Sequence, residues 1–431
     1  MAELERLQRA RAVNGWLWRL VLGLFFVMGL AGCTAVSQTH PLPTRVALAF
    51  VPELSPSKTP IPPTFTPKPV TAVPTPTLPG PLPTFTPSST PLPIPTNTPV
   101  TPTNTPTITP SATPALYISP TPVIKPLNQY SINEIIPYEA FPHPPNDNGW
   151  GMHWMPTVKQ NPGVVDRFVA EAVRMHIKWV VFLNDGTNIG DNDYLVEKLV
   201  ANGIMPVMRL YQSEVVPYDG NLGEMIAHYR AKGVYYFQIY NEPNVNIENK
   251  QGFANPNQYA VAWAFAARAV VANGGLPGIG ALSPGGEYQA LDFFDRTLRA
   301  LAYNGDAYLL NHAWVAVHNY HGTRPYDDIG GFLQFRKYDE IVRSHLGRSL
   351  PIIGTEGGSY HPDPAVETEF IRYQYNYMRS PNREPYFFAF SWWLLANKEG
   401  GGHDEAWEWQ ALFRPGFVHP AVTEFFYKNG G

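Results

Sequence analysis

Eight short runs of β-branched and aromatic residues alternate with longer helical segments from residue 149 onward, and this alternation constrains the fold more than any other feature. The predicted strands span 149–155, 179–184, 205–211, 235–240, 278–283, 314–320, 350–355 and 386–394. Helices are predicted between them, because apolar residues recur there every three or four positions. Examples are 164–176, 194–201, 259–272 and 365–378. Strands that alternate with helices form parallel sheets, so the fold class is α/β.

The number of strand–helix units predicts a (β/α)8 TIM barrel rather than an open doubly wound sheet, since such a barrel needs about 250 residues. Glycines in Asn202-Gly203 and Asn273-Gly274 follow helical segments, as expected for helix ends. No Gly-x-Gly-x-x-Gly follows the first strand and no Walker-type loop occurs, so no cofactor is expected. In a barrel of this kind, chemistry takes place at the C-terminal ends of the strands.

A stretch rich in proline and threonine precedes the predicted barrel. Residues 41–128 hold 26 of the 46 prolines and 19 threonines, but only five charged residues. Such a composition cannot bury enough apolar surface to offset the chain entropy lost on folding. We therefore predict a disordered Pro/Thr-rich linker over residues 34–128 and a folded domain over residues 129–431.

The first 33 residues are typical of a secretory signal peptide. Four arginines between residues 6 and 19 precede the apolar run 20–30, and small residues follow it. The tetrapeptide Leu30-Ala31-Gly32-Cys33 resembles the lipobox of bacterial lipoproteins, which implies lipid attachment at Cys33. An uncleaved signal anchor over residues 16–32 is the alternative. Either interpretation places residues 34–431 outside the cytoplasm, and the first predicts a cell-surface lipoprotein held at the membrane by a lipid anchor.

The charge of the predicted domain excludes one class of partner. Residues 129–431 contain 23 basic and 32 acidic residues, a formal net charge of −9. A surface of that sign repels phosphate backbones, so no nucleic acid partner is expected. The single cysteine excludes an intramolecular disulfide and a multi-cysteine metal site. We expect a monomer.

Two of the predicted strands each carry a glutamate to their C-terminal end. The fourth strand continues into Asn241-Glu242-Pro243, and the seventh continues into Glu356. Burying an unpaired carboxylate costs free energy, so a purely structural role for these glutamates is unfavourable. Cleavage of a glycosidic bond requires two carboxylates, one to protonate the leaving oxygen and one to attack or to activate water. The pattern therefore indicates glycosidase chemistry.

This pair of motifs resembles the clan-A glycoside hydrolases, which include the cellulase-like family 5 enzymes. The order of elements is similar from residue 149 to about residue 426. The resemblance implies that residues 129–431 form a glycoside hydrolase-like catalytic domain, acting with retention on β-linked poly- or oligosaccharides. It also implies that Glu242 is the acid/base, that Glu356 is the nucleophile, and that Asn241 holds the sugar 2-hydroxyl. The expected partner is therefore a carbohydrate substrate.

Strand 6 resembles the same family through His318-Asn319-Tyr320, which matches its His-x-Tyr. In those enzymes the tyrosine hydroxyl contacts the nucleophile carboxylate. Packing of Tyr320 in the barrel mouth, with His318 bonded to backbone, is the alternative. Family members usually carry an arginine after strand 2. This chain has none there. Either Arg209 at the end of strand 3 supplies that charge beside Glu356, or the chain resembles another family of the clan.

The end of strand 8, Ser391-Trp392-Trp393, offers an indole ring on which a sugar can stack. Trp392 matches the position in the family better, and Trp393 lies within the error of the predicted strand boundary. The roles of Trp150, His153 and Trp154 at strand 1 remain open between substrate contact and core packing. The loop 397–409 is equally open between sugar binding and an ordinary surface loop.

Two other functions are alternatives to a retaining glycoside hydrolase. One is a non-catalytic carbohydrate-binding surface lipoprotein with a glycosidase-like barrel. The other is a metal-dependent barrel hydrolase, which would need a pattern such as His-x-His on strand 1, where His153 stands alone. His318 and His321 are three residues apart, so they point to opposite sides of a strand. No metal site is therefore expected.

Overall fold

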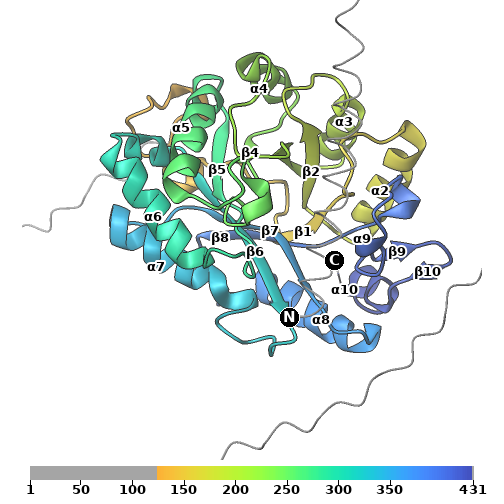
Figure 1. The fold of residues 1–431 in the computed structure, drawn as a ribbon. Helices are drawn as coiled ribbons and strands as arrows, with labels where there is room; N and C mark the ends of the chain where they lie inside the picture. The colour runs from red at the N-terminus through yellow and green to blue at the C-terminus, as the bar shows by residue number, and fades with distance from the viewer. Residues whose placement is uncertain (1–123, 430–431) are drawn as a thin grey trace, which may run out of the picture. The chain divides into compact units, whose positions relative to one another are not determined.

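The computed structural model describes residues 124–429, and it confirms the predicted (β/α)8 TIM barrel. Eight parallel strands close the barrel in the order of the sequence (Figure 1). They are β1 Trp150–His153, β2 Trp179–Asp185, β3 Met205–Tyr211, β4 Tyr236–Ile239, β5 Leu276–Gly280, β6 Trp314–Gly322, β7 Ile352–Ser359 and β8 Phe387–Trp392. The predicted signal peptide, Cys33 and the linker up to residue 123 lie outside the described residues.

Seven longer helices lie around the outside of the barrel (Figure 1). They are α2 Pro162–Arg174, α3 Asp193–Ala201, α4 Leu222–Ala231, α5 Pro256–Ala272, α6 Ala290–Tyr303, α7 Phe335–Leu346 and α8 Pro364–Arg379. The shorter elements are η1 Leu127–Gln129, η2 Tyr138–Ala140, η3 Asn246–Glu248, η4 Ala307–Asn311, η5 Phe332–Gln334, η6 Lys398–Gly400, α9 Glu405–Glu408, β9 Phe413–Arg414, β10 Phe417–Val418, η7 Val422–Phe426 and α10 Tyr427–Asn429. Among residues 124–429, no helix has both the length and the apolar character that a membrane span requires.

Helix ends follow the local signals in the sequence. Asn161, Asn255 and Asp363 cap the first turns of α2, α5 and α8 with their side chains, and a proline follows each of them. Gly203 and Gly274, after α3 and α5, have φ angles of 64° and 73°. This left-handed conformation suits glycine, so the predicted ends of these two helices are confirmed.

Strand β5 was predicted at 278–283, but it spans Leu276–Gly280. The start of this strand is hard to predict from the sequence, since Pro277 and two glycines are poor strand formers. The structure explains one of these glycines. A Cβ atom at Gly278 would lie 2.5 Å from the ring of Trp314 on the neighbouring strand, so only glycine fits.

Strand β7 was predicted to end at residue 355, but it continues to Ser359 and thus contains Glu356. Its pairing with β6 is irregular between Val317 and His318, where the register shifts by one residue. As a result, His318 pairs with Glu356 across the two strands. The irregularity therefore places two predicted site residues side by side.

The core has two parts. A large cluster fills the space between the strands and the surrounding helices. A second cluster fills the base of the barrel, the end at which the strands begin, with residues such as Trp179, Tyr236 and Trp314. Ile136 and Phe141 join this second cluster from residues 127–143, which we call the N-terminal segment. The N-terminal segment therefore closes the barrel at the end opposite to the C-terminal ends of the strands.

Candidate active site

The structure brings the two predicted glutamates together at the C-terminal end of the barrel. Glu242 follows β4 and Glu356 lies in β7, and both residues are buried, with exposed fractions of 6% and 5%. One oxygen of each carboxylate and one ring nitrogen of His318 lie within 4.8 Å of one another. In glycosidases that retain the anomeric configuration, the two carboxyl groups are about 5–5.5 Å apart. The spacing therefore fits direct attack by one carboxylate.

The backbone around Glu242 adopts a left-handed conformation that non-glycine residues rarely show. The φ angles of Tyr240 and Glu242 are 60° and 44°. Such residues cost on the order of 1–3 kcal/mol each, and they cluster at functional sites. The N–H of Glu242 donates to the carbonyl of Ala281 at 2.8 Å, and the Asn244 side chain links this loop to Ser283. The loop after β5 thus holds the strained loop of Glu242 in place.

Each oxygen of Glu356 accepts a hydrogen bond from its own donor. Arg209 Nη1 donates to Oε1 at 2.7 Å, and the Tyr320 hydroxyl donates to Oε2 at 3.0 Å. Burial, and then the charge of Glu356, raises the pKa of Tyr320 well above its ordinary value of 10, so the hydroxyl keeps its proton. The two donors fix the orientation of the carboxylate and stabilise its negative charge. Arg209 therefore stands beside Glu356, where a charge was expected.

His318 lies between the two glutamates. Its Nδ1 atom is 3.1 Å from Glu242 Oε1 and 3.6 Å from Glu356 Oε2, and its side chain is fully buried. Gln334 Nε2 donates to the backbone carbonyl of His318 at 2.9 Å. The imidazole therefore bonds to Glu242 and lies close to Glu356, rather than bonding to backbone as in the alternative considered above.

The expected position of the tryptophan is wrong by one residue. Trp392 packs in the cluster between strands and helices, and it pairs across the sheet with Met152, which faces the same way. Side chains alternate along a strand, so the next residue faces the site. The ring centroid of Trp393 lies 4.3 Å from that of His153 and 5.5 Å from that of Trp407. The ring at the site is therefore that of Trp393.

His153, whose role the sequence left open, belongs to the site. Its ring is fully buried, and Nε2 lies 4.0 Å from Glu356 Oε1, beyond hydrogen-bond distance. Its position as the last residue of β1 was the available signal, because catalytic groups of barrels stand at such ends.

In the loop after β8, Trp407 packs on Trp393 and the Trp409 ring lies 6.2 Å from that of Tyr360.

Glu242, His318 and Glu356 are a group whose ligand atoms lie close enough together to hold a metal ion. The guanidinium of Arg209, bonded to Glu356, places a positive charge beside them that repels a cation. His321 faces away from the group, since its Nδ1 atom contacts Gln374 on α8. The prediction that the two histidines point to opposite sides of the strand is confirmed.

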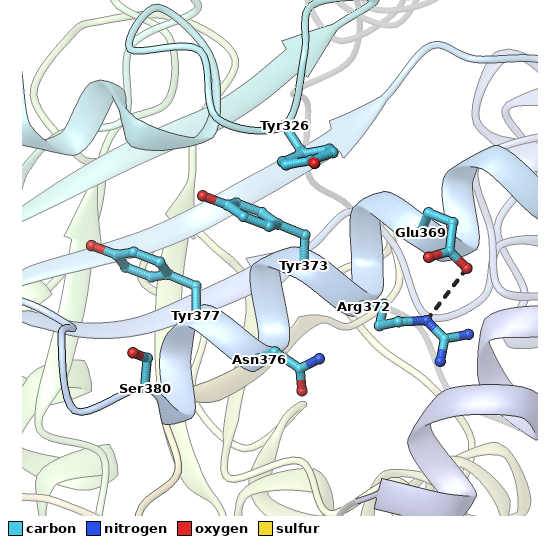
Figure 2. A pocket seen from close by; sticks show the side chains of 7 residues that line it. All are labelled: Tyr326, Glu369, Arg372, Tyr373, Asn376, Tyr377 and Ser380. Atoms are coloured by element: carbon cyan, nitrogen blue, oxygen red, sulfur yellow. Dashed lines mark ion pairs between the residues drawn. The ribbon is translucent and has the colours of Figure 1, made fainter.

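A separate pocket of about 470 Å³ lies on the outer surface along α8, and the two glutamates do not line it. Figure 2 shows its lining residues, Tyr326, Glu369, Arg372, Tyr373, Asn376, Tyr377 and Ser380. The rings of Tyr326 and Tyr373 pack against each other, with centroids 4.4 Å apart. Arg372 pairs with Glu369 at 3.4 Å.

Comparison with known proteins finds matches among solved structures alone, since no protein-family model and no curated protein matches the chain. A β-glucuronidase from Bacteroides uniformis is 13% identical over 67% of this chain, with a TM-score of 0.42, and the chain spans 35% of it. An endo-β-1,4-mannanase from Thermotoga petrophila is 13% identical over 71% of this chain and 79% of its own, with a TM-score of 0.41. An endo-β-1,4-glucanase from Xanthomonas axonopodis pv. citri is 14% identical over 63% of this chain and 90% of its own, with a TM-score of 0.41. Similarity at this level says nothing about activity, so the function depends on the geometry of the site.

Several buried polar atoms at this end of the barrel have no hydrogen-bond partner among the described residues. They are both ring nitrogens of His153, Arg209 Nε, Gln238 Oε1, Asn241 Oδ1, His318 Nε2 and Trp393 Nε1. Buried polar groups normally have partners, so unpaired ones at a site call for a ligand or ordered water. Donors and acceptors are mixed in this set. Such a mixture suits hydroxyl groups, which both donate and accept.

Proposed function

We propose that the protein is a retaining glycoside hydrolase that cleaves O-glycosidic bonds in β-linked poly- or oligosaccharides. The observation that carries this proposal is the pair of buried carboxylates, with oxygens within 4.8 Å, one of which has a separate donor on each oxygen. An inverting mechanism needs about 6.5–9.5 Å between the carboxyl groups, to leave room for water. The geometry therefore supports double displacement.

In the first step, Glu356 attacks the anomeric carbon while Glu242 donates its proton to the leaving oxygen, so that a glycosyl ester forms and the glycosidic bond breaks. Arg209 and Tyr320 hold the attacking carboxylate in its orientation. In the second step, Glu242 takes a proton from water, which displaces Glu356 and returns both carboxyl groups to their first state. His318 contacts Glu242 and is placed to assist these proton transfers.

The test uses p-nitrophenyl β-glycosides of glucose, mannose, galactose and glucuronic acid, together with β-glucan and β-mannan. We expect turnover with retention, followed by NMR of the first product anomer. Glu356→Ala should lose the glycosyl ester that a 2-deoxy-2-fluoro glycoside traps, as read by mass spectrometry. Glu242→Ala should still form that ester from a substrate with a good leaving group, and azide should restore its slow second step.

Three results would contradict the proposal: an inverted first product, full activity in either alanine variant, or loss of activity on treatment with EDTA. Binding of β-glucan or β-mannan without turnover would instead favour the carbohydrate-binding lipoprotein.

We also propose that the mature protein is attached to the membrane through a lipid on Cys33. The support is the lipobox-like sequence Leu30-Ala31-Gly32-Cys33 after an apolar run. Wild-type protein should incorporate an alkyne-labelled fatty acid, and Cys33→Ser should not. Equal labelling of both proteins would reject lipid attachment at this cysteine.

A further inference from the structure

His153 lies next to the nucleophile without bonding to it. It is the last residue of β1, and its Nε2 atom is 4.0 Å from Glu356 Oε1. That oxygen already accepts the hydrogen bond from Arg209 Nη1. The ring of Trp393 packs against the imidazole, with ring centroids 4.3 Å apart and planes at 58°. The ring is therefore held in one place by packing and not by hydrogen bonds.

Neither ring nitrogen of His153 has a hydrogen-bond partner among residues 124–429, although the side chain is fully buried. A buried polar group without a partner lowers stability, and an aromatic hydrocarbon such as phenylalanine would fill the same space without that cost. A histidine at this position is therefore expected to meet a polar group that enters the site.

The chemical state of the imidazole limits what that group can be. Burial, and then the positive charge of Arg209 and the neighbouring His318, lowers the pKa of His153 well below its ordinary value of 6.5. The ring is thus neutral near pH 7, with one N–H donor and one acceptor nitrogen. A neutral ring does not attract an anion, but it matches hydroxyl groups, which donate and accept in turn.

We propose that His153 contacts the substrate directly: its ring nitrogens bond hydroxyl groups of the sugar that Glu356 attacks, and so select among sugars. This inference rests on the proposed glycosidase function. It adds a specificity-determining residue on β1 to the carboxylates after β4 and in β7, beyond the residues that the sequence motifs indicate.

The test compares His153→Phe with wild type on the p-nitrophenyl glycoside of the panel that is turned over fastest, and on its monodeoxy analogues. Phenylalanine keeps the ring that packs on Trp393 but removes both nitrogens. We expect kcat/KM on the parent glycoside to fall by roughly 10- to 100-fold. On the analogue that lacks the contacted hydroxyl, wild type and variant should differ by less than about 3-fold.

His321→Phe is the matched control, because His321 is also buried with an unpaired ring nitrogen but faces α8. It should lower the melting temperature without changing the ratio of rates between sugars. An equal loss by His153→Phe on the parent and on every deoxy analogue would overturn the proposed contact while leaving the glycosidase function standing. If wild type turned over none of the glycosides, the proposed function would fail, and the contact with it.

Discussion

Single residues at the site show what a motif can and cannot predict. Glu242 and Glu356 were predicted to share one site because Asn-Glu-Pro and a second glutamate follow predicted strands. The structure brings the two carboxylates together. The tryptophan was misplaced because the strand boundary sets which side chains face inward, and an error of one residue exchanges the two faces. His153 belongs to no motif, so the sequence left its role open, and the fold places its ring beside Glu356.

Tyr320→Phe should lower kcat/KM by roughly 10- to 100-fold, because a hydrogen bond to a charged group contributes about 1.5–3 kcal/mol. The hydroxyl donates to Glu356 Oε2 at 3.0 Å, and its loss leaves that oxygen without this donor. Steady-state kinetics on an aryl glycoside measures the effect. Tyr326→Phe, a change on the exposed surface, is the control and should leave kcat/KM within 2-fold. Similar rates for wild type and Tyr320→Phe would show that this contact does not support catalysis.

At the scale of elements, the strands and helices were predictable where residue pattern and caps agree. The predicted strand 278–283 was displaced because Pro277 and the glycines of β5 do not form a β-branched run. The shift in register between β6 and β7 could not be predicted, because it depends on how two distant strands pair. The folded domain was predicted to begin at residue 129, but the closure of the barrel base by the N-terminal segment was not predicted, since its residues carry no regular periodicity.

Phe141→Ala should lower the free energy of unfolding by about 3–5 kcal/mol while kcat stays within 2-fold. The side chain is buried in the base of the barrel, and its ring lies 6.1 Å from that of Phe388. Urea unfolding followed by tryptophan fluorescence measures the loss, and turnover is measured below the transition. A matched exposed change, Ile135→Ala, should alter the stability by less than 1 kcal/mol. A variant as stable as wild type would show that the N-terminal segment does not contribute to the folded core.

The whole molecule combines an acidic surface with several buried histidines. Burial lowers the pKa of His312, and burial followed by the charge of Arg324 lowers the pKa of His321 to about 4. Below an ordinary value of 6.5 the unfolded chain takes up protons at these positions, whereas the folded chain does not. The contribution of these two histidines to stability is therefore fully present above about pH 6.5 and is lost as the pH falls towards 4.

His321 alone should account for about 3 kcal/mol of this loss, since each unit of pKa shift corresponds to 1.36 kcal/mol. His321→Asn cannot titrate, so its free energy of unfolding should fall less steeply than that of wild type between pH 6.5 and 4.5. Chemical denaturation at a series of pH values measures both slopes. His403→Asn removes an exposed imidazole and serves as the control, with the wild-type slope expected. Parallel curves for wild type and His321→Asn would contradict the assignment.

A chain that begins at residue 124 should unfold in one cooperative transition and keep the activity of the full chain. The reason is that contacts of the domain start near this position, where Lys125 pairs with Glu134 and Leu127 packs against the base cluster. Calorimetry and kcat/KM on the same glycoside provide the comparison. A chain that begins at residue 144 lacks the N-terminal segment and should melt at a markedly lower temperature. Equal melting of the two shortened chains would refute the role of the segment.

The N-terminal segment also determines at which end of the barrel the chain enters the described domain. Residue 124 leads into the base of the barrel, whereas Glu242 and Glu356 stand at the other end. The described domain therefore begins at one end of the barrel and carries the two carboxylates at the other end. If the proposed glycosidase function holds, a polymeric substrate approaches Glu242 and Glu356 at the end of the barrel that lies away from residue 124.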